Sequence, residues 1–336
     1  MASRGRDQPL QTLPLGATVV VIRLRSLGDA VLTTPALRIL RESRPDLDVT
    51  VVLDRPLAPL LEGSPDIDQV LAVDRGRTRQ AIEKIRRDRP DLCLNLHGGS
   101  SSAWMTWLSG ARYRAGYAHF AKSFVYNIRI PRAQQILGLP GEAPVHTAEH
   151  HASAMFHLGA DRRPIPGARL HAEPGPAERP YAVVHVAAAY ETKRWQAEHF
   201  VRVAEVVRER HGLEPVILAG PGQDDLLEQF GAFETRRGVS IAALKNLLAG
   251  ASLFVGNDSG PAHIAAAFEV PSAVIFGSSS SPVWGPWRTP AEVLETEWPC
   301  KPCAGDRCYA FDEPRCILSV TPDSVLAAIG RLLQKT

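Results

Sequence analysis

The chain has 336 residues, of which 45% are hydrophobic and 22% are charged, and its net charge is +2. That composition is typical of a soluble globular protein, and the length is sufficient for two domains. Nothing in it favours a nucleic-acid partner, and we expect none.

The amino-terminal segment lacks the features of a secretory signal. Residues 1–16 carry Arg4, Arg6 and Asp7 without a continuous apolar stretch. The first apolar run, residues 17–22, is far shorter than the ~18 residues that cross a bilayer. We therefore expect a cytoplasmic protein, one that could still lie on a membrane surface.

Charge is unevenly distributed along the chain. Residues 1–170 hold 23 Lys and Arg against 16 Asp and Glu, or +7, and the remainder holds 15 against 20, or −5. A basic first half suggests an anionic partner there. A chance imbalance of solvated surface charge is the alternative.

Strands and helices alternate along the chain. Apolar, β-branched runs predict strands at residues 18–24, 49–53, 69–73, 92–96, 181–186, 215–218, 253–255 and 272–276. Helical patterns are predicted at residues 36–42, 79–87, 147–158, 197–209 and 241–248. Such alternation favours an α/β fold with parallel sheets covered on both faces.

A stretch rich in Pro, Gly and charge divides the chain into two halves. It predicts a first lobe at residues 1–165, a linker at 166–180 and a second lobe at 181–320. A last helix is predicted at 321–336, because Thr321 suits the N-cap and Pro322 suits the first helical position. This amphipathic helix could return to dock on the first lobe.

The first strand-to-helix turn contains the acid Asp29. Ligands of open α/β sheets lie beyond the carboxyl ends of the strands, where Asp29 is expected. A carboxylate in the first turn of a helix feels the positive end of the helix dipole and can serve as a general base. Helix capping alone is the competing interpretation. Pro35 should kink this helix or split it in two.

The segment FVGNDSGPAHIAAAFEVPSAVIFG, residues 254–277, predicts strand, polar turn, short helix and strand. Pro261 falls in the first helical turn, where its missing N–H costs nothing. The free N–H groups at such a helix start bind phosphate. An ordinary capped turn explains Asp258 and Ser259, but it does not explain why His263 follows at this spacing.

Together the two segments, RLRSLGDAVLTTPALRILR and FVGNDSGPAHIAAAFEVPSAVIFG, resemble glycosyltransferase family 9, the bacterial heptosyltransferases. The resemblance extends from about Val19 to about Gln334. It implies a GT-B fold, in which two Rossmann-like lobes face each other across a cleft. The second lobe would bind a nucleotide sugar and the first the acceptor, and transfer would invert the anomeric centre without a metal or other required cofactor.

The resemblance also implies roles for individual residues. Asp29 would deprotonate the acceptor hydroxyl. The donor's diphosphate and nucleoside would contact a set drawn from the second lobe: Thr192, Lys193, Asp224, Asp258, Ser259, Gly260 and His263. Asp224 or Asp225 stands where the family often has Glu, and because an Asp side chain is shorter we expect a different contact with the ribose.

The family's acceptor is an anionic, Kdo-bearing glycolipid at the inner face of the inner membrane. A basic segment interleaved with aromatics, near Arg112 and Arg114, would suit that anion and peripheral contact with the membrane. His97 ends the fourth strand and should face the same cleft. The expected acceptor-binding residues are Ser26, Gly28, His97, Arg112 and Arg114, with ordinary surface and core as the alternative.

Three other sequence features bear on different functions: a protease-like string, two acidic strings and the glycines of the first helix. The NDSG string resembles that of serine proteases, but it lies in an α/β pattern. The D-x-D strings at 46–48 and 66–68 precede their strands, which favours surface capping over a metal site. No G-x-G-x-x-G opens the first helix, so a dehydrogenase is disfavoured.

Four of the five cysteines cluster near the carboxyl terminus, at Cys300, Cys303, Cys308 and Cys316. Their thiolates could hold a structural zinc ion or an iron–sulfur cluster, although the spacing fits neither usual pattern. Reduced thiols in a loop are the alternative.

The sequence thus predicts an inverting, metal-independent glycosyltransferase that moves a heptose from ADP-heptose to an anionic lipopolysaccharide core acceptor. A different sugar or acceptor, or a nucleotide-binding module without catalysis, remain the alternatives.

Overall fold

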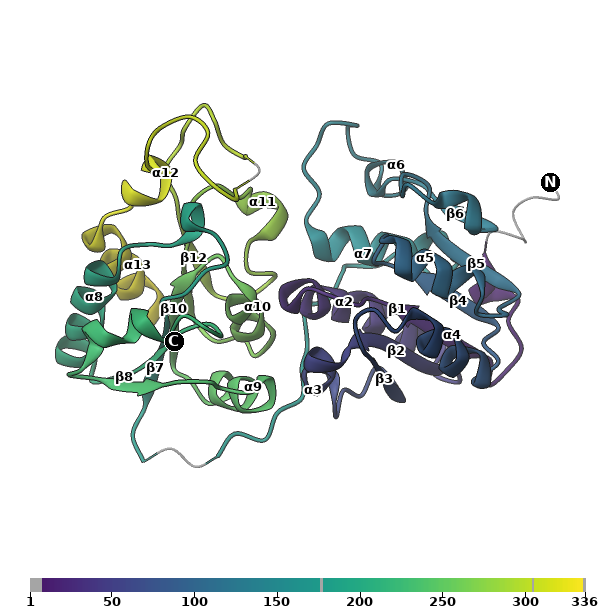
Figure 1. Ribbon diagram of the computed structural model, residues 1–336, viewed down its shortest axis with the longest axis horizontal. Coiled ribbons are helices and arrows are strands. Elements are labelled where there is room, and N and C mark those ends of the chain that lie inside the picture. Colours follow the sequence, from purple (N-terminus) through teal and green to yellow (C-terminus); the bar gives the residue numbers. More distant parts are fainter. Residues whose placement is uncertain (1–7, 176–177, 304, 335–336) are drawn as a thin grey trace. The chain divides into compact units, whose positions relative to one another are not determined.

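A computed structural model describes residues 8–175, 178–303 and 305–334 of the chain (Figure 1). The chain divides into two units, Met1–His171 and Ala172–Thr336. The division falls inside the stretch 166–180 that its composition suggested as a linker.

The first unit is built on a parallel sheet with the strand order β3-β2-β1-β4-β5-β6. Within the described residues its six strands are β1 (Thr18–Ile22), β2 (Asp48–Asp54), β3 (Gln69–Val73), β4 (Leu92–Asn95), β5 (Tyr113–Tyr117) and β6 (Ile128–Ile130). Val19 is in register with Val49 on one side and Leu92 on the other. The central strands are almost wholly buried because helices cover both faces.

Most helices of this unit lie between successive strands, and the last two follow β6. They are α2 (Leu27–Ser43), α3 (Ala58–Leu61), α4 (Thr78–Arg87), α5 (Ser100–Trp107), α6 (Ala133–Leu137) and α7 (Thr147–His157), with 3₁₀ turns η1 (Pro9–Gln11), η2 (Arg55–Leu57) and η3 (Ser123–Val125). Helix α2 packs along α7, and α4 packs along α5. Ile85 of α4 and Met105 of α5 share a core cluster with Val20, Ile22 and Cys93 of the sheet.

The second unit repeats this plan. Its sheet has the order β12-β11-β10-β7-β8-β9, again all parallel. Its strands are β7 (Tyr181–His185), β8 (Glu214–Leu218), β9 (Glu234–Arg236), β10 (Leu253–Asn257), β11 (Ser272–Ile275) and β12 (Ala291–Leu294). Counted within each unit, both sheets follow the Rossmann order 3-2-1-4-5-6.

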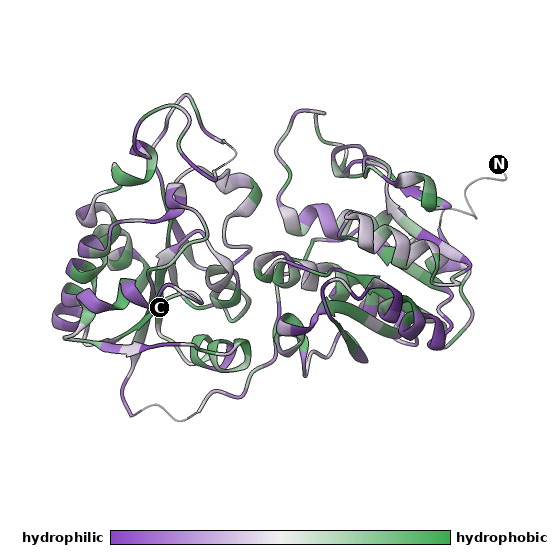
Figure 2. Ribbon diagram, in the orientation of Figure 1, coloured by the Kyte–Doolittle hydropathy of each residue, from purple (hydrophilic) through white to green (hydrophobic). Residues whose placement is uncertain are grey.

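The remaining elements surround this second sheet. They are α8 (Ala197–His211), α9 (Ile241–Ala249), α10 (Gly260–Ala267), α11 (Ser281–Trp284), α12 (Arg315–Leu318) and α13 (Pro322–Gln334), with 3₁₀ turns η4 (Glu191–Lys193) and η5 (Asp224–Phe230). Figure 2 shows hydrophobic residues concentrated on the strands and on the helix faces that cover them. A single core cluster joins Val184, Trp195, Phe200 and Val255.

Helix α13 packs within the second unit. It contacts α8, β11 and β12. Val325, Ile329 and Leu332 are buried in the second unit's core cluster. These residues recur every three or four positions, and the sheet directly beside them buries that stripe.

Helix α2 runs unbroken through Pro35, so the expected split does not occur. Proline removes the N–H that would bond to the carbonyl of Val31. The hydroxyl of Thr34 donates to that carbonyl instead, at 2.8 Å. The carbonyl is therefore not left unsatisfied within the helix.

Across the described ranges, no helix combines the length and apolarity needed to traverse a membrane.

Candidate active site

Each sheet has a switch point, where the chain leaves two adjacent strands in opposite directions. In the first sheet it lies between β1 and β4, and in the second between β7 and β10. Ligands of open α/β sheets bind beyond the carboxyl ends of the strands at such a point.

In the first unit, Asp29 stands in the opening turn of α2, directly after β1. Its Oδ2 accepts hydrogen bonds from the backbone N–H of Ser26 at 3.2 Å and from the Ser26 hydroxyl at 2.8 Å. This is a capping box, so Asp29 does cap the helix. Four lone-pair sites on a carboxylate leave room for a further proton donor.

The other oxygen of Asp29 forms an ion pair with Arg23, which follows β1 directly. A second guanidinium nitrogen, Nη1, donates to the carbonyl of Leu96 at 2.6 Å. Both charged side chains are largely buried, at 11% and 15% exposed. Burial lowers the pKa of Arg23, while the charge of Asp29 opposes that shift. The sequence analysis missed Arg23, whose only signal is its place between a buried strand and the SLGD turn.

The loop after β4 lies at the same switch point. The side-chain oxygen of Asn95 accepts from the backbone N–H of His97 at 2.9 Å and of Gly98 at 3.0 Å. The hydrogen bond from the Arg23 guanidinium to the Leu96 carbonyl joins the loops after β1 and β4. Burial, then the charges of Arg23 and Arg25, lower the pKa of His97 and favour the neutral ring.

Two ring side chains, one from β5 and one from α7, lie near Arg23. The rings of Tyr117 and His150 stack at 4.0 Å, and the Tyr117 hydroxyl donates to the His150 carbonyl at 2.6 Å. Burial, helped by His119 and Arg23, lowers the pKa of His150 to about 4. The ring is therefore neutral at pH 7 and leaves Arg23 as the cation beside Asp29.

The structure does not place Arg112 and Arg114 at the carboxyl edge of the sheet. Strand β5 begins at Tyr113, so Arg112 lies at the amino edge, while Asp29 and His97 follow carboxyl ends. The Arg114 guanidinium donates to the carbonyls of Ala111 and Val125. We therefore remove both arginines from the acceptor site.

Ser26, Gly28 and His97 remain at the carboxyl edge of the sheet. The D-x-D strings do not, because β2 begins at Asp48 and β3 at Gln69. Three of their four carboxylates, those of Asp46, Asp66 and Asp68, form ion pairs with Arg44, Arg169 and Arg41.

In the second unit, Asp258 follows β10 and is the centre of a polar network. Its Oδ2 accepts from the ammonium of Lys193 at 2.9 Å and from the hydroxyl of Ser279 at 2.5 Å. Asp258 is buried, whereas the Lys193 side chain is 25% exposed. The carboxylate thus holds a lysine that can still reach an anion in solvent.

Neighbouring buried groups fix this network. The side-chain oxygen of Asn257 accepts from the Trp195 backbone at 3.0 Å, and its amide donates to the Val186 carbonyl at 3.0 Å. The Ser259 hydroxyl lies 3.3 Å from Nδ1 of His185, whose pKa burial lowers to about 4. Sequence reasoning missed Asn257, Ser279 and His185, because each acts through a partner distant in sequence.

Helix α10 begins at Gly260, with Pro261 in its first turn and the buried His263 one turn in. The backbone N–H groups of such a helix start form an anion site. The predicted residues Asp258, Ser259, Gly260 and His263 therefore gather at one helix end. Lys193 joins them from η4.

Two other predicted donor residues are placed differently. Thr192 is buried, and its hydroxyl bonds the Ser278 hydroxyl at 3.0 Å and the Gly305 carbonyl. It holds the η4 turn in place and does not present its hydroxyl to a ligand. Asp224 begins η5 beyond the carboxyl end of β8, half-buried.

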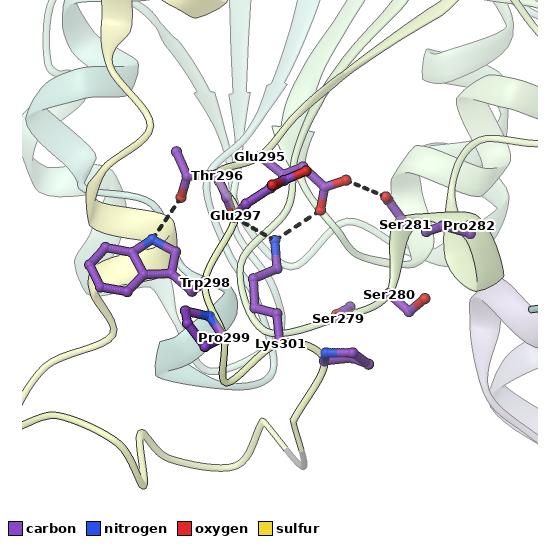
Figure 3. A pocket seen from close by; sticks show the side chains of 11 residues that line it. Ser279, Ser280, Ser281, Pro282, Glu295, Thr296, Glu297, Trp298, Pro299 and Lys301 are labelled. Carbon is purple, nitrogen blue, oxygen red and sulfur yellow. Dashed lines mark hydrogen bonds and ion pairs between the residues drawn. The ribbon is translucent and has the colours of Figure 1, made fainter.

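A pocket of ≈660 Å³ lies next to this network and includes Ser279 in its wall. Figure 3 shows the Lys301 ammonium directed at Glu295, to which it bonds at 2.8 Å. The Ser281 hydroxyl also donates to Glu295, and Trp298 of the pocket wall donates its indole N–H to the Thr296 hydroxyl at 3.1 Å. Hydroxyls, carboxylates and an indole ring are the groups that bind a polar, ring-shaped ligand of this size.

The four clustered cysteines lie before and within α12, in the part of the chain that the structure describes. There, no group of three or more His, Cys, Asp or Glu side chains is arranged to hold a metal ion. Cys316 is buried in α12, whereas Cys303 is exposed. Burial first, and then the charges of Cys300 and Cys303, raise the pKa of Cys316, and the ligand set Cys300, Cys303, Cys308 and Cys316 stays a prediction.

The sequence model of glycosyltransferase family 9 (heptosyltransferase) matches residues 78–311, more than half of the chain. The chain belongs to glycosyltransferase family 9. It is accordingly a glycosyltransferase, and this confirms the family identified from the two sequence motifs.

Relatives within the family match nearly the whole length. Lipopolysaccharide heptosyltransferase 3 of Escherichia coli is 27% identical over 349 residues, which cover 92% of this chain and 97% of that protein. A family 9 structure from Veillonella parvula has a TM-score of 0.79 at 22% identity, covering 95% and 98%. The E. coli ADP-heptose lps heptosyltransferase II has a TM-score of 0.78 at 21% identity, covering 95% and 99%. The fold prediction of two Rossmann-like units of GT-B type is thereby confirmed.

Proposed function

We propose that this glycosyltransferase moves a heptose from ADP-heptose to an anionic inner-core acceptor of lipopolysaccharide, with inversion and without a metal. One observation carries the proposal: an ion-paired acid, Asp29, and an anion-binding helix end at Gly260 each occupy the switch point of a Rossmann sheet. The names of the relatives support the sugar and the acceptor, and ADP-heptose appears in the name of a relative of the same fold.

The second unit would bind the donor. The diphosphate would lie at the start of α10, where backbone N–H groups, Lys193 and His263 meet it. Negative charge grows on the departing ADP, so these groups stabilise the transition state more than the ground state. Asp224 would meet the ribose, and the sugar would extend into the pocket beside Ser279 and Glu295.

The first unit would bind the acceptor through Ser26, Gly28 and His97. Asp29 takes the proton from the acceptor hydroxyl, and that oxygen attacks the anomeric carbon. The bond from this carbon to the ADP oxygen breaks with its electron pair moving to ADP. A single displacement of this kind inverts the anomeric centre. We place the reaction in the cytoplasm, at the inner face of the inner membrane.

A donor screen tests this function. Thermal unfolding is measured with ADP, UDP, GDP and their sugar conjugates, and tight binding raises the melting temperature. We expect ADP and ADP-heptose to give the largest increases, and transfer from ADP-heptose to Kdo-bearing lipid A to continue in EDTA. Stabilisation by UDP or GDP alone would contradict the donor, and abolition of transfer by EDTA would contradict metal independence.

A further inference from the structure

Helix α5 carries large apolar side chains on its outward face. Trp104, Trp107 and Leu108 are 38%, 47% and 42% exposed, whereas Met105 and Thr106 between them are buried. The three recur at helical spacing, so they form one stripe. Phe124 of the adjoining turn η3 is 65% exposed and continues it. We call Trp104, Trp107, Leu108 and Phe124 the aromatic face.

This face is separate from the groups at the carboxyl edge of the sheet. The Trp104 and Trp107 rings lie 5.1 Å apart, in contact with each other and open to solvent. Contiguous exposed patches of large apolar side chains mark the surfaces through which proteins bind other proteins, membranes or ligands. The chemistry of its surroundings indicates the kind of partner.

Those surroundings are strongly basic. Residues 75–132 contain 12 Lys and Arg against 3 Asp and Glu, or +9, in a chain whose net charge is +2. Helices α4 and α5 pack together, and each ends just before its next strand, at the amino edge of the sheet. Arg86 and Arg87 are exposed in the last turn of α4, the helix that packs along α5.

We propose that the aromatic face, together with the basic side chains of residues 75–132, docks the protein on an anionic lipid bilayer. Trp and Phe partition into the interfacial region of a bilayer, and nearby Lys and Arg are attracted to anionic headgroups. Charge complementarity favours a lipid surface over an ordinary protein interface, because residues 75–132 hold 12 basic side chains against 3 acidic ones. Docking would hold the first unit beside a lipid-anchored acceptor, so the proposal extends the proposed function.

Vesicle flotation with the full chain tests docking directly. Vesicles of phosphatidylcholine alone are compared with vesicles containing about one third phosphatidylglycerol, and neither carries an acceptor. We expect binding to the anionic vesicles only, weakened by salt, because the basic attraction is screened within a Debye length. Since no sugar is transferred, failure here is distinguishable from failure of the proposed function.

Two pairs of variants separate the apolar and the charged contributions. Trp107→Ser with Phe124→Ser should weaken binding about tenfold or more, and Arg86→Gln with Arg87→Gln should do the same. Matched controls are Leu15→Ser with Tyr309→Ser, at positions 88% and 61% exposed, and Arg210→Gln with Arg237→Gln. The controls should bind as the wild type does, and circular dichroism checks that every variant is folded.

Equal binding by wild type and both face variants would overturn the proposal. So would equal affinity for neutral and anionic vesicles. A third result would also contradict the proposal: the chain does not bind vesicles but forms an oligomer, and this oligomer dissociates in the Trp107→Ser with Phe124→Ser variant. The aromatic face would then be a protein interface.

Discussion

Asp29 is held from two sides, by Arg23 at the end of β1 and by Ser26 at the start of α2. Arg23 is in turn anchored to the Leu96 carbonyl of the neighbouring loop. A carboxylate fixed in this way keeps one orientation toward a bound hydroxyl, which is what a general base needs. We therefore regard Arg23 as a positioning residue.

Replacing Arg23 tests that role. Arg23→Met should lower kcat by about 10- to 100-fold through misplacement of Asp29, while donor affinity stays unchanged. Arg23→Lys should recover part of the loss, because an ammonium keeps the charge but lacks the two-pronged geometry. Steady-state kinetics and donor titration measure the two effects. A kcat within twofold of wild type for Arg23→Met would rule out positioning.

Sequence reasoning found the residues that sit inside local motifs and missed those that act through the fold. Asp29, Asp258 and His263 could be predicted from the sequence because each belongs to a short strand–turn–helix pattern. Arg23 and His150 are not, because their partners are fixed by packing of elements far apart in sequence. Arg112 was misplaced for a related reason: its strand was not predicted, so its position at the amino edge was hidden.

At the scale of elements, the predicted strands were those with continuous apolar runs, and all eight are present. The four that were missed lack such runs. Strand β5 mixes Arg and Gly with its apolar residues, and β6, β9 and β12 are short strands at sheet edges. Edge strands bury less apolar surface, so their sequences carry a weaker signal.

The close approach of η4 to the loop after β11 positions Lys193. A Cβ at Gly277 would lie 2.0 Å from the Thr192 carbonyl oxygen, so the turn can come this close only to glycine. Gly277→Ala should lower the free energy of unfolding by about 1–3 kcal/mol and weaken donor binding as Lys193 moves. Urea denaturation and ADP titration measure both effects.

Gly231→Ala is the matched control, because a Cβ there meets nothing within 4 Å and its φ of −59° suits alanine. It should leave stability and binding close to wild type. Equal behaviour of the two variants would mean that the Gly277 contact does not position the turn.

At the scale of the whole molecule, buried neutral histidines should make stability depend on pH. Burial lowers the pKa of His150, in the first unit, and of His185, in the second, from 6.5 to about 4. Between those values the unfolded chain binds protons that the folded chain does not. Stability is therefore fully present above pH 6.5 and falls as the pH decreases toward 4, by up to about 1 kcal/mol per pH unit for each histidine.

Urea denaturation at pH 7, 6 and 5 measures this slope. His150→Gln should make it shallower, whereas His171→Gln, at an exposed position, should not. An unchanged slope in His150→Gln would show that His150 does not cause the dependence.

The central claim is that Asp29 removes the acceptor proton while the second unit alone holds the donor. Comparing turnover and donor affinity in Asp29→Asn tests it most directly, since the amide keeps the shape but cannot take a proton at neutral pH. We predict a loss in kcat of at least about 10²-fold with an unchanged dissociation constant for ADP-heptose. A folded variant that turns over within a few-fold of wild type would contradict the mechanism.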